Sequence, residues 1–166
     1  MRISPMLSRF LFCSIIVIPA WTFADSSLGN LNIDLSDSTH YVKAGSYDDS
    51  DLYLFKTSIR ADSRQATGTK GLSLFLIRDY RNNYTQDTIR KVDGSIKKSG
   101  IFYNRAAVDT SINCLSKEFT ANRTALIRDG EIVEDRSSEI YWIKAPIGTP
   151  YRKAIDLACS IGSKYL

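Results

Sequence analysis

The chain has 166 residues, of which 43% are hydrophobic and 24% are charged, and its formal net charge at pH 7 is +4. Its length fits a single domain with one core. Lys and Arg are scattered among Asp and Glu, so a solvated surface explains the charge better than a nucleic-acid interface does, and we expect no nucleic-acid partner.

The first 24 residues have the three parts of a secretory signal peptide. Arg2 and Arg9 supply positive charge, residues 10–20 form an almost wholly apolar run, and small residues precede a predicted cleavage site after Ala24. This run is too short to span a bilayer, which needs about 20 apolar residues. We therefore expect an exported chain with no transmembrane span after cleavage. An uncleaved anchor helix is the alternative.

Two cysteines remain after this cleavage, Cys114 and Cys159. An even pair in an exported chain predicts a disulfide, because the compartment outside the cytosol is oxidising. The two cysteines are 45 residues apart in the sequence. Closing a loop of that length stabilises the fold by about 4 kcal/mol in a chain-entropy estimate. A reactive thiol or a metal site is the alternative, but the pair lacks CxxC spacing and the chain has a single histidine.

The first half of the chain predicts strands separated by polar segments. Residues 25–51 are polar and predict a short strand at most, followed by a loop. Residues 52–60 predict a strand with a bulge or a strand end near Lys56, and residues 71–80 a central strand with both faces apolar. The polar insertion 81–100 has room for a short hairpin with Asp93-Gly94 as its turn.

The second half of the chain predicts further strands and a final helix. Strand patterns cover residues 101–103, 106–114, 118–128 and 139–144, and Asp129-Gly130 suits a two-residue turn into a strand at 131–135.

In the final segment, Thr149 and Pro150 are typical of a helix start, apolar residues recur at helical spacing, and Gly162 is expected to end the helix. The fold class is therefore α+β, a meandering antiparallel β-sheet with a C-terminal helix packed on one face. The disulfide would join that helix to the strand ending at Cys114.

The sequence offers no set of catalytic residues. His40 is the only histidine and falls in a polar region that favours an exposed loop. Two acidic clusters, at 48–51 and 131–135, are better explained as solvated acids than as the paired carboxylates of a glycosidase. We expect no enzyme activity, no metal site and no cofactor.

The mature chain contains nine tyrosines. Tyrosine is common at protein contact surfaces, and it is also ordinary in strands. The candidate binding residues are Tyr80, Tyr84, Tyr103, Tyr141 and Trp142.

The order of these segments resembles the surface-adhesin protein E family of Gram-negative bacteria. The segments that carry the resemblance are Tyr53–Arg60, Leu72–Tyr80, Ile112–Cys114, Phe119–Thr124 with Asp129-Gly130, Trp142–Pro146 and Thr149–Cys159. The resemblance implies a domain over 52–166, displayed at or near the outer membrane, which binds host extracellular proteins and admits a homodimer. The chain departs from the family in having Asn113 before its first cysteine, and in a longer insertion at 81–100.

Three functions follow as hypotheses. The first is a non-enzymatic envelope protein of adhesin type, in the periplasm or at the outer-membrane surface, which binds another protein of unknown identity. The second is a periplasmic accessory subunit or inhibitor of an envelope machine or cell-wall hydrolase. The third is a small hydrolase that uses a carboxylate pair.

Overall fold

The computed structural model describes residues 33–62, 71–82, 85–90 and 95–166. The predicted signal peptide at 1–24, the candidate Tyr84 and the expected turn Asp93-Gly94 lie outside the described residues. Within the described ranges, no helix has the length and apolar character needed to cross a membrane.

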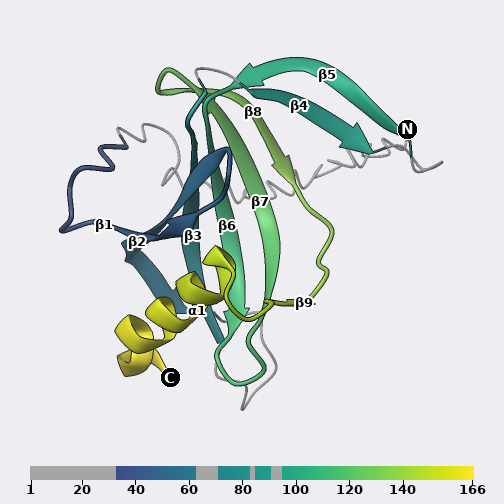
Figure 1. Ribbon diagram of the computed structural model, residues 1–166. Coiled ribbons are helices and arrows are strands. Elements are labelled where there is room, and N and C mark those ends of the chain that lie inside the picture. The colour runs from purple at the N-terminus through teal and green to yellow at the C-terminus, as the bar shows by residue number, and fades with distance from the viewer. Residues whose placement is uncertain (1–32, 63–70, 83–84, 91–94) are drawn as a thin grey trace, which may run out of the picture.

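The described strands form one main antiparallel sheet and one separate hairpin (Figure 1). The main sheet contains β1 (Tyr41–Ser46), β2 (Ser50–Ala61), β3 (Gly71–Tyr80), β6 (Arg105–Asn113), β7 (Glu118–Arg128), β8 (Glu131–Ser137) and β9 (Ile143–Lys144). The first six lie side by side in that order, and β9 pairs with β7 beyond the end of β8. The hairpin consists of β4 (Thr85–Arg90) and β5 (Ile96–Tyr103). The predicted meander is confirmed.

Strand β3 lies at the centre of the main sheet, as its two apolar faces predicted. Leu72, Leu74 and Leu76 belong to the buried cluster that the C-terminal helix covers. Phe75 and Ile77 belong to a second buried cluster, and strand geometry places them on the opposite face. Because both faces are covered, the strand has no alternation of apolar and polar residues.

The C-terminal helix α1 (Pro150–Ile161) begins as predicted and packs across β1 and β2 (Figure 1). The side chain of Thr149 accepts a hydrogen bond from the N–H of Arg152 at 3.2 Å, which caps the first turn. Ala154, Ile155 and Ala158 are the buried residues of the helix. This apolar stripe joins the helix to the leucines of the sheet in one core.

As predicted, α1 ends at Gly162, which is also the first residue of the 3₁₀-helix η2 (Gly162–Tyr165). The physical reason for a glycine at this position differs from the expected one. Its φ is −84°, so it does not use the left-handed conformation in which glycine often ends helices. A Cβ at this position would lie 2.6 Å from Cδ1 of Leu72 and 2.9 Å from Cγ2 of Ile59. Glycine is needed here because the chain passes directly over the sheet.

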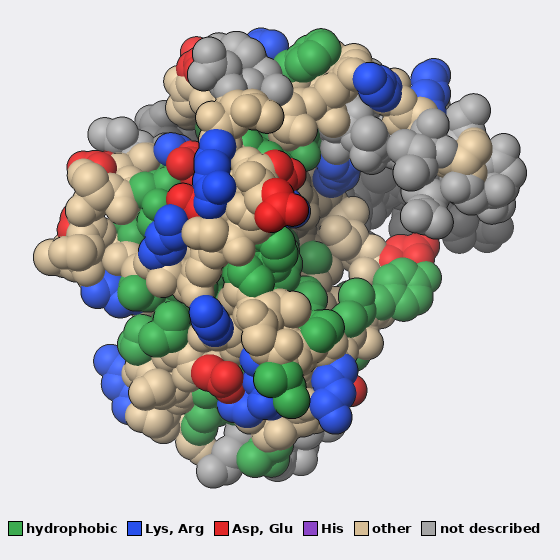
Figure 2. Space-filling view, viewed as in Figure 1, with side chains coloured by type: hydrophobic (Ala, Val, Ile, Leu, Met, Phe, Trp, Pro, Cys, Tyr) green, Lys and Arg blue, Asp and Glu red, His purple; other side chains and the backbone are tan. Residues whose placement is uncertain are grey.

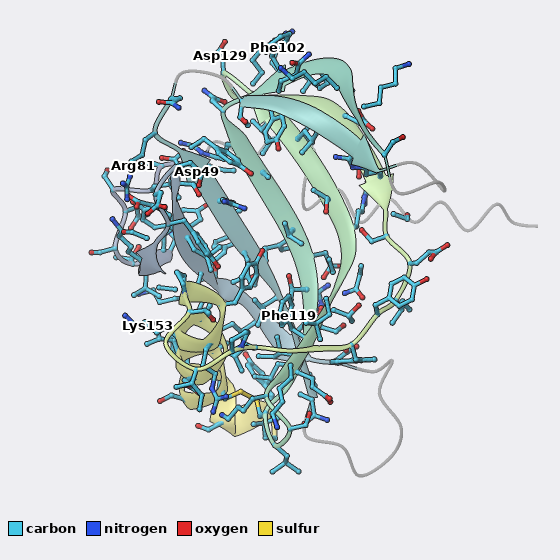
Figure 3. All side chains as sticks on the ribbon, turned by 45° about the vertical axis from the view of Figure 1, so that its right-hand side comes forward. Asp49, Arg81, Phe102, Phe119, Asp129 and Lys153 are labelled. Atoms are coloured by element: carbon cyan, nitrogen blue, oxygen red, sulfur yellow. A yellow bond between two sulfur atoms is a disulfide. The ribbon has the colours of Figure 1, made fainter. Side chains whose placement is uncertain are left out.

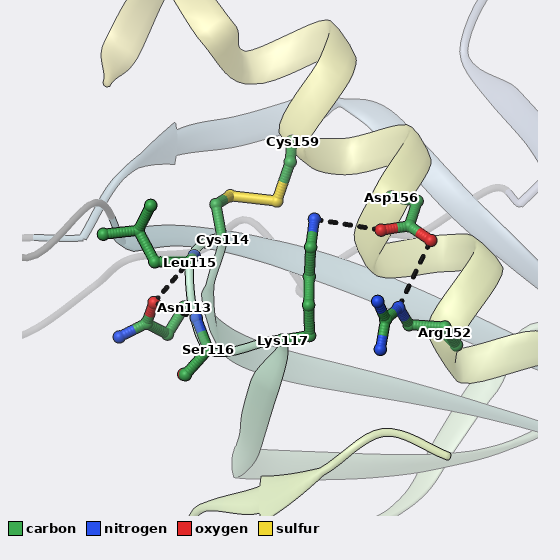
Figure 4. The surroundings of a disulfide bond; sticks show 8 residues. All are labelled: Asn113, Cys114, Leu115, Ser116, Lys117, Arg152, Asp156 and Cys159. Carbon is green, nitrogen blue, oxygen red and sulfur yellow. Dashed lines mark hydrogen bonds and ion pairs between the residues drawn. A yellow bond between two sulfur atoms is a disulfide. The ribbon is translucent and has the colours of Figure 1, made fainter. Parts of the chain in front are cut away.

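Cys114 and Cys159 form the predicted disulfide, with their Cα atoms 5.8 Å apart (Figure 4). Cys114 follows the last residue of β6, and Cys159 lies in the last turn of α1. The bond therefore joins the end of the helix to the end of a central strand.

Two expectations about the strands were wrong in part. The segment 25–51 contains a full edge strand, β1, so the sheet begins before residue 52. A register shift between Lys43 and Gly45 breaks the alternation of β1, which hid the strand from pattern reading. The expected strand at 139–144 is reduced to the two residues of β9, because the chain leaves β7 between 138 and 143.

Candidate functional site

Strand pairing is interrupted at the edge of the sheet formed by β8 and β9. Just after β8, the N–H of Ser138 donates to the carbonyl oxygen of Asn122 in β7 at 2.9 Å. The chain then leaves β7 and returns at Ile143, which pairs with Phe119. Within the described part of the chain, residues 139–142 make no backbone hydrogen bond. We call residues 139–144 the arch.

Large apolar side chains on and beside the arch are exposed to solvent. The exposed fractions are 70% for Leu115, 63% for Ile140, 64% for Tyr141, 42% for Trp142, 55% for Ile143 and 89% for Ile147. We call these six residues the apolar rim, and Figure 2 shows hydrophobic side chains following this segment on the right of the molecule. Exposed apolar patches that include Tyr and Trp are typical of protein contact surfaces.

The loop that carries Leu115 is held in place by its neighbours. Oδ1 of Asn113 accepts hydrogen bonds from the N–H groups of Leu115 at 2.9 Å and Ser116 at 3.1 Å. Lys117 adopts a left-handed φ of 60°, and its carbonyl oxygen accepts the N–H of Ala145 at 3.0 Å. The loop and the segment after the arch are therefore bound to each other.

Lys117 also connects this loop to the helix (Figure 4). Its Nζ lies 2.9 Å from Oδ1 of Asp156, whose other oxygen lies 3.3 Å from Nε of Arg152. The hydrogen bond from Lys117 is the largest of the interactions that lower the pKa of Asp156. Together with the adjacent disulfide, this ion pair holds in place the loop that carries Leu115 and the segment that follows the arch.

A second group of aromatic side chains packs on the helix side of the sheet. The guanidinium of Arg78 lies 4.9 Å from the ring centre of Tyr47 and 5.0 Å from that of Tyr80. Tyr80 meets Tyr103 edge to face at 5.3 Å between centroids. Burial is the main cause that raises the pKa of Tyr80. These rings pack on Arg78 or on each other, so internal packing accounts for part of the tyrosine content.

The four predicted binding residues that the structure describes fall in two different places. Tyr80 and Tyr103 lie in the aromatic group beside Arg78, where Tyr103 is buried. Tyr141 and Trp142 lie on the apolar rim, and the Tyr141 hydroxyl donates a hydrogen bond to the carboxylate of Glu139. That hydrogen bond raises the pKa of Tyr141.

Sequence reasoning missed the aliphatic members of the rim, which are Leu115, Ile140, Ile143 and Ile147. A signal was present in the run 140–143, which is apolar at every position without being long enough to form a buried strand or helix. The run was interpreted as strand only, so its exposure was not foreseen.

The first acidic cluster is occupied by ion pairs. Asp51 accepts hydrogen bonds from Nζ of Lys43 at 2.7 Å and from Arg81 at 2.6 Å, and Asp49 accepts one from Arg78 at 3.0 Å. The hydrogen bond from Ser50, followed by that from Arg78, lowers the pKa of Asp49, and the hydrogen bonds from Lys43 and Arg81 lower the pKa of Asp51. Figure 3 shows Asp49 close to Arg81.

The second acidic cluster is engaged in the same way. Asp135 pairs with Arg123 across β7 and β8, and Glu134 lies 3.7 Å from Arg136. A carboxyl group that acts as a general acid needs a raised pKa. The lowered pKa values of Asp49 and Asp51 in the first cluster therefore favour a structural role for these two carboxylates. In the described residues, no three metal-binding side chains come together.

A shallow hollow of about 430 Å³ lies between β1 and α1. Its lining residues are Ala44, Lys153, Asp156, Leu157 and Ser160. The only acid among them is the partner of Lys117 and Arg152. The apolar rim is therefore the surface with the clearest means of binding another molecule.

Comparison with protein-family models, with curated proteins and with solved structures returned no match.

Proposed function

We propose that this chain is an exported, non-enzymatic envelope protein of adhesin type, which binds another protein through the apolar rim. The observation that carries the proposal is the exposure of the six rim side chains on and beside the β8–β9 edge of the sheet. The disulfide agrees with an oxidising compartment outside the cytosol. The resemblance to the protein E family adds the class of partner, a host extracellular protein.

The physical basis of binding is burial of the rim. Each apolar side chain that a partner covers contributes through the area removed from water, at about 25 cal/mol per Å². The loop support matters because binding to an ordered surface loses little conformational entropy. Leu115 and Ile147 are the most exposed members, and so have the largest fraction of their area left to bury.

The test is retention of the purified protein on immobilised fibronectin, laminin and collagen. We expect the wild-type protein to be retained by at least one of them, and the double variant Leu115→Ser, Ile147→Ser to bind about tenfold more weakly. Ile161→Ser is the matched control, because Ile161 is also an exposed isoleucine but lies at the end of α1.

Two results would contradict this proposal. Failure of the wild-type protein to bind any of the three matrices would remove the adhesin function, and equal binding by the rim variant would remove the rim as the contact. Protease added to intact cells tests the location. Digestion of the protein supports display at the cell surface, and protection supports a periplasmic pool and the accessory or inhibitor function.

A further inference from the structure

We propose that the arch is a proteolytic cleavage site, at which an endoprotease that prefers aromatic residues cuts the folded protein after Tyr141 or Trp142. The product is a protein of two chains joined by the disulfide, with a weakened apolar rim. The inference rests on the proposed function only for this effect on the rim, and the cleavage itself is argued independently of it.

The first argument is that the arch is too long to be held by the sheet. Just before it, the N–H of Ser138 donates to the carbonyl oxygen of Asn122, and near its end Ile143 pairs with Phe119. Between these two contacts, four residues of the arch pass only two residues of β7, so the two segments cannot pair one to one. The chain therefore stands out from the sheet between β8 and β9 (Figure 1).

The second argument is that the main chain and the aromatic side chains of the arch are both accessible. A protease must bind the main chain on both sides of the bond that it cuts, and in most of a folded chain this requires a local opening. Residues 139–142 make no backbone hydrogen bond to the described residues, so the arch needs no such opening. Tyr141 and Trp142 are 64% and 42% exposed, so a pocket that selects aromatic side chains can reach either of them.

The last peptide bond of this segment is protected, which limits the accessible stretch. A protease of trypsin-like specificity would cut between Lys144 and Ala145. However, Ala145 is only 1% exposed, and its N–H donates to the carbonyl oxygen of Lys117 at 3.0 Å. The arch is therefore open to a protease that selects aromatic residues and closed to one that selects basic residues.

The cut would leave the two products attached to each other. The smaller product begins at residue 142 or 143 and contains α1, in which Cys159 is bonded to Cys114 of the larger product (Figure 4). Nζ of Lys117 in the larger product also lies 2.9 Å from Asp156 in the smaller one. The buried residues of α1 and Ala145 belong to the same core as the leucines of the sheet. These contacts lie outside the cleaved bond, so the helix stays in place.

Hydrolysis would change the chemistry of the apolar rim. Water adds across the peptide bond and the C–N bond breaks, so the larger product gains a carboxylate and the smaller product gains an ammonium group. Both charges arise between Ile140 and Ile143, which are exposed members of the rim. A partner that covers the rim would have to bury these charges, which is costly. Cleavage therefore weakens binding at the rim without unfolding the protein.

The test is limited digestion by chymotrypsin of the protein as purified from the producing cell. The digest is separated on denaturing gels with and without reductant, and the products are identified by N-terminal sequencing. We expect a product that begins at Trp142 or Ile143 and separates only in reductant. Absence of both N-termini from the digest of the folded protein overturns the inference, as does a product that separates without reductant.

Variants test whether the aromatic residues and the unpaired main chain direct the cut. The double variant Tyr141→Ser, Trp142→Ser keeps the length of the arch, and we expect it to be cut there about tenfold more slowly. Phe102→Ser is the matched control, which should leave that rate unchanged. Phe102 is also an exposed aromatic residue, at 45%, but it is paired with Gln86 in the β4–β5 hairpin.

Trypsin provides the contrasting experiment, because we expect no cut after Lys144 in the folded protein. Such a cut would show that the whole edge of the sheet opens, and it would overturn the inference. Cleavage of the double variant at the arch as fast as the wild type would overturn it as well.

Binding of the cut protein separates this inference from the proposed function. If intact protein is retained on an immobilised matrix protein, we expect the cut protein to bind about tenfold more weakly. Equal binding overturns the effect on the rim. If intact protein binds none of the matrices, the proposed function fails, and the digest still decides whether the arch is a cleavage site.

Discussion

At the scale of single residues, one carboxylate connects three strands at a corner of the sheet. Asp51 in β2 accepts hydrogen bonds from Lys43 in β1 and from Arg81, which follows β3. Only 19% of its side chain is exposed, so water screens these contacts less than it would at an open surface. The hydrogen bond from Lys43, followed by that from Arg81, lowers the pKa of Asp51.

This lowered pKa predicts a dependence of stability on pH. A group whose pKa is lower in the folded state stabilises the fold above its unfolded pKa of about 3.9, and that contribution is lost as the pH falls. We expect the free energy of unfolding, measured by urea titration, to fall between about pH 5 and pH 2. Asp51→Asn should be less stable than the wild type at pH 7 and should lose less on acidification.

Asp48→Asn is the matched control for that experiment. This substitution removes the same charge from the adjacent β1–β2 turn, and the side chain of Asp48 makes no hydrogen bond or ion pair within the described residues. If the unfolding free energy of Asp51→Asn falls with pH in parallel with that of the wild type, the hydrogen bonds from Lys43 and Arg81 do not cause the loss of stability in acid.

Gly162 provides a second prediction at this scale. We expect Gly162→Ala to reduce the free energy of unfolding by about 1–3 kcal/mol, because the new methyl group would press on Leu72 and Ile59. Chemical denaturation measures the change, and Ser163→Ala at the next, exposed position is the control. Unchanged stability of Gly162→Ala would mean that the helix end can move away from the sheet at little cost.

At the scale of elements, the helix is fixed to the sheet at both of its ends. Its first turn is capped by Thr149, beside Gly45 of β1, where a Cβ would lie 3.0 Å from Cβ of Pro150, and its last turn carries the disulfide. Between them, Asp156 pairs with Lys117 of the β6–β7 loop. A helix of 12 residues is marginal alone in water, so its stability depends on these attachments and on its buried stripe.

Removal of the disulfide should therefore weaken the whole fold. We expect the double variant Cys114→Ser, Cys159→Ser to lose about 2–4 kcal/mol of unfolding free energy, since the closed loop spans 45 residues. The wild-type protein in excess reductant should unfold at the same urea concentration as this variant. An unchanged midpoint in both experiments would show that packing alone holds the helix.

At the scale of the whole molecule, sequence patterns predicted most of the sheet but not its edges. The central strand at 71–80, the turn at Asp129-Gly130 and the helix from Pro150 have local signals that tertiary contacts reinforce. At the edges, contacts decide the outcome. A bulge breaks the alternation of apolar and polar residues by which β1 could have been recognised in the sequence. The arch leaves β7 although its residues favour a strand.

The candidate site was harder to predict than the fold for a related reason. Tyr141 and Trp142 were expected to be contact residues and are exposed, but Tyr103 has the same side chain as Tyr141 and is buried. Residue type does not distinguish these two tyrosines. Their exposure differs because of their positions in the fold. Tyr103 is the last residue of β5 and its ring packs on Tyr80, whereas Tyr141 lies between β8 and β9, where the chain is not paired with β7.

The β4–β5 hairpin has a consequence for how this chain can vary. Its described residues pair with no strand of the main sheet, and it leaves and rejoins that sheet through Tyr80 and Tyr103, whose rings touch. The two points at which the hairpin joins the sheet are thus held close together by the contact between these two rings. Natural variation, or a designer who grafts a foreign loop, can lengthen, shorten or replace the hairpin at this junction while β3 and β6 remain paired beneath it.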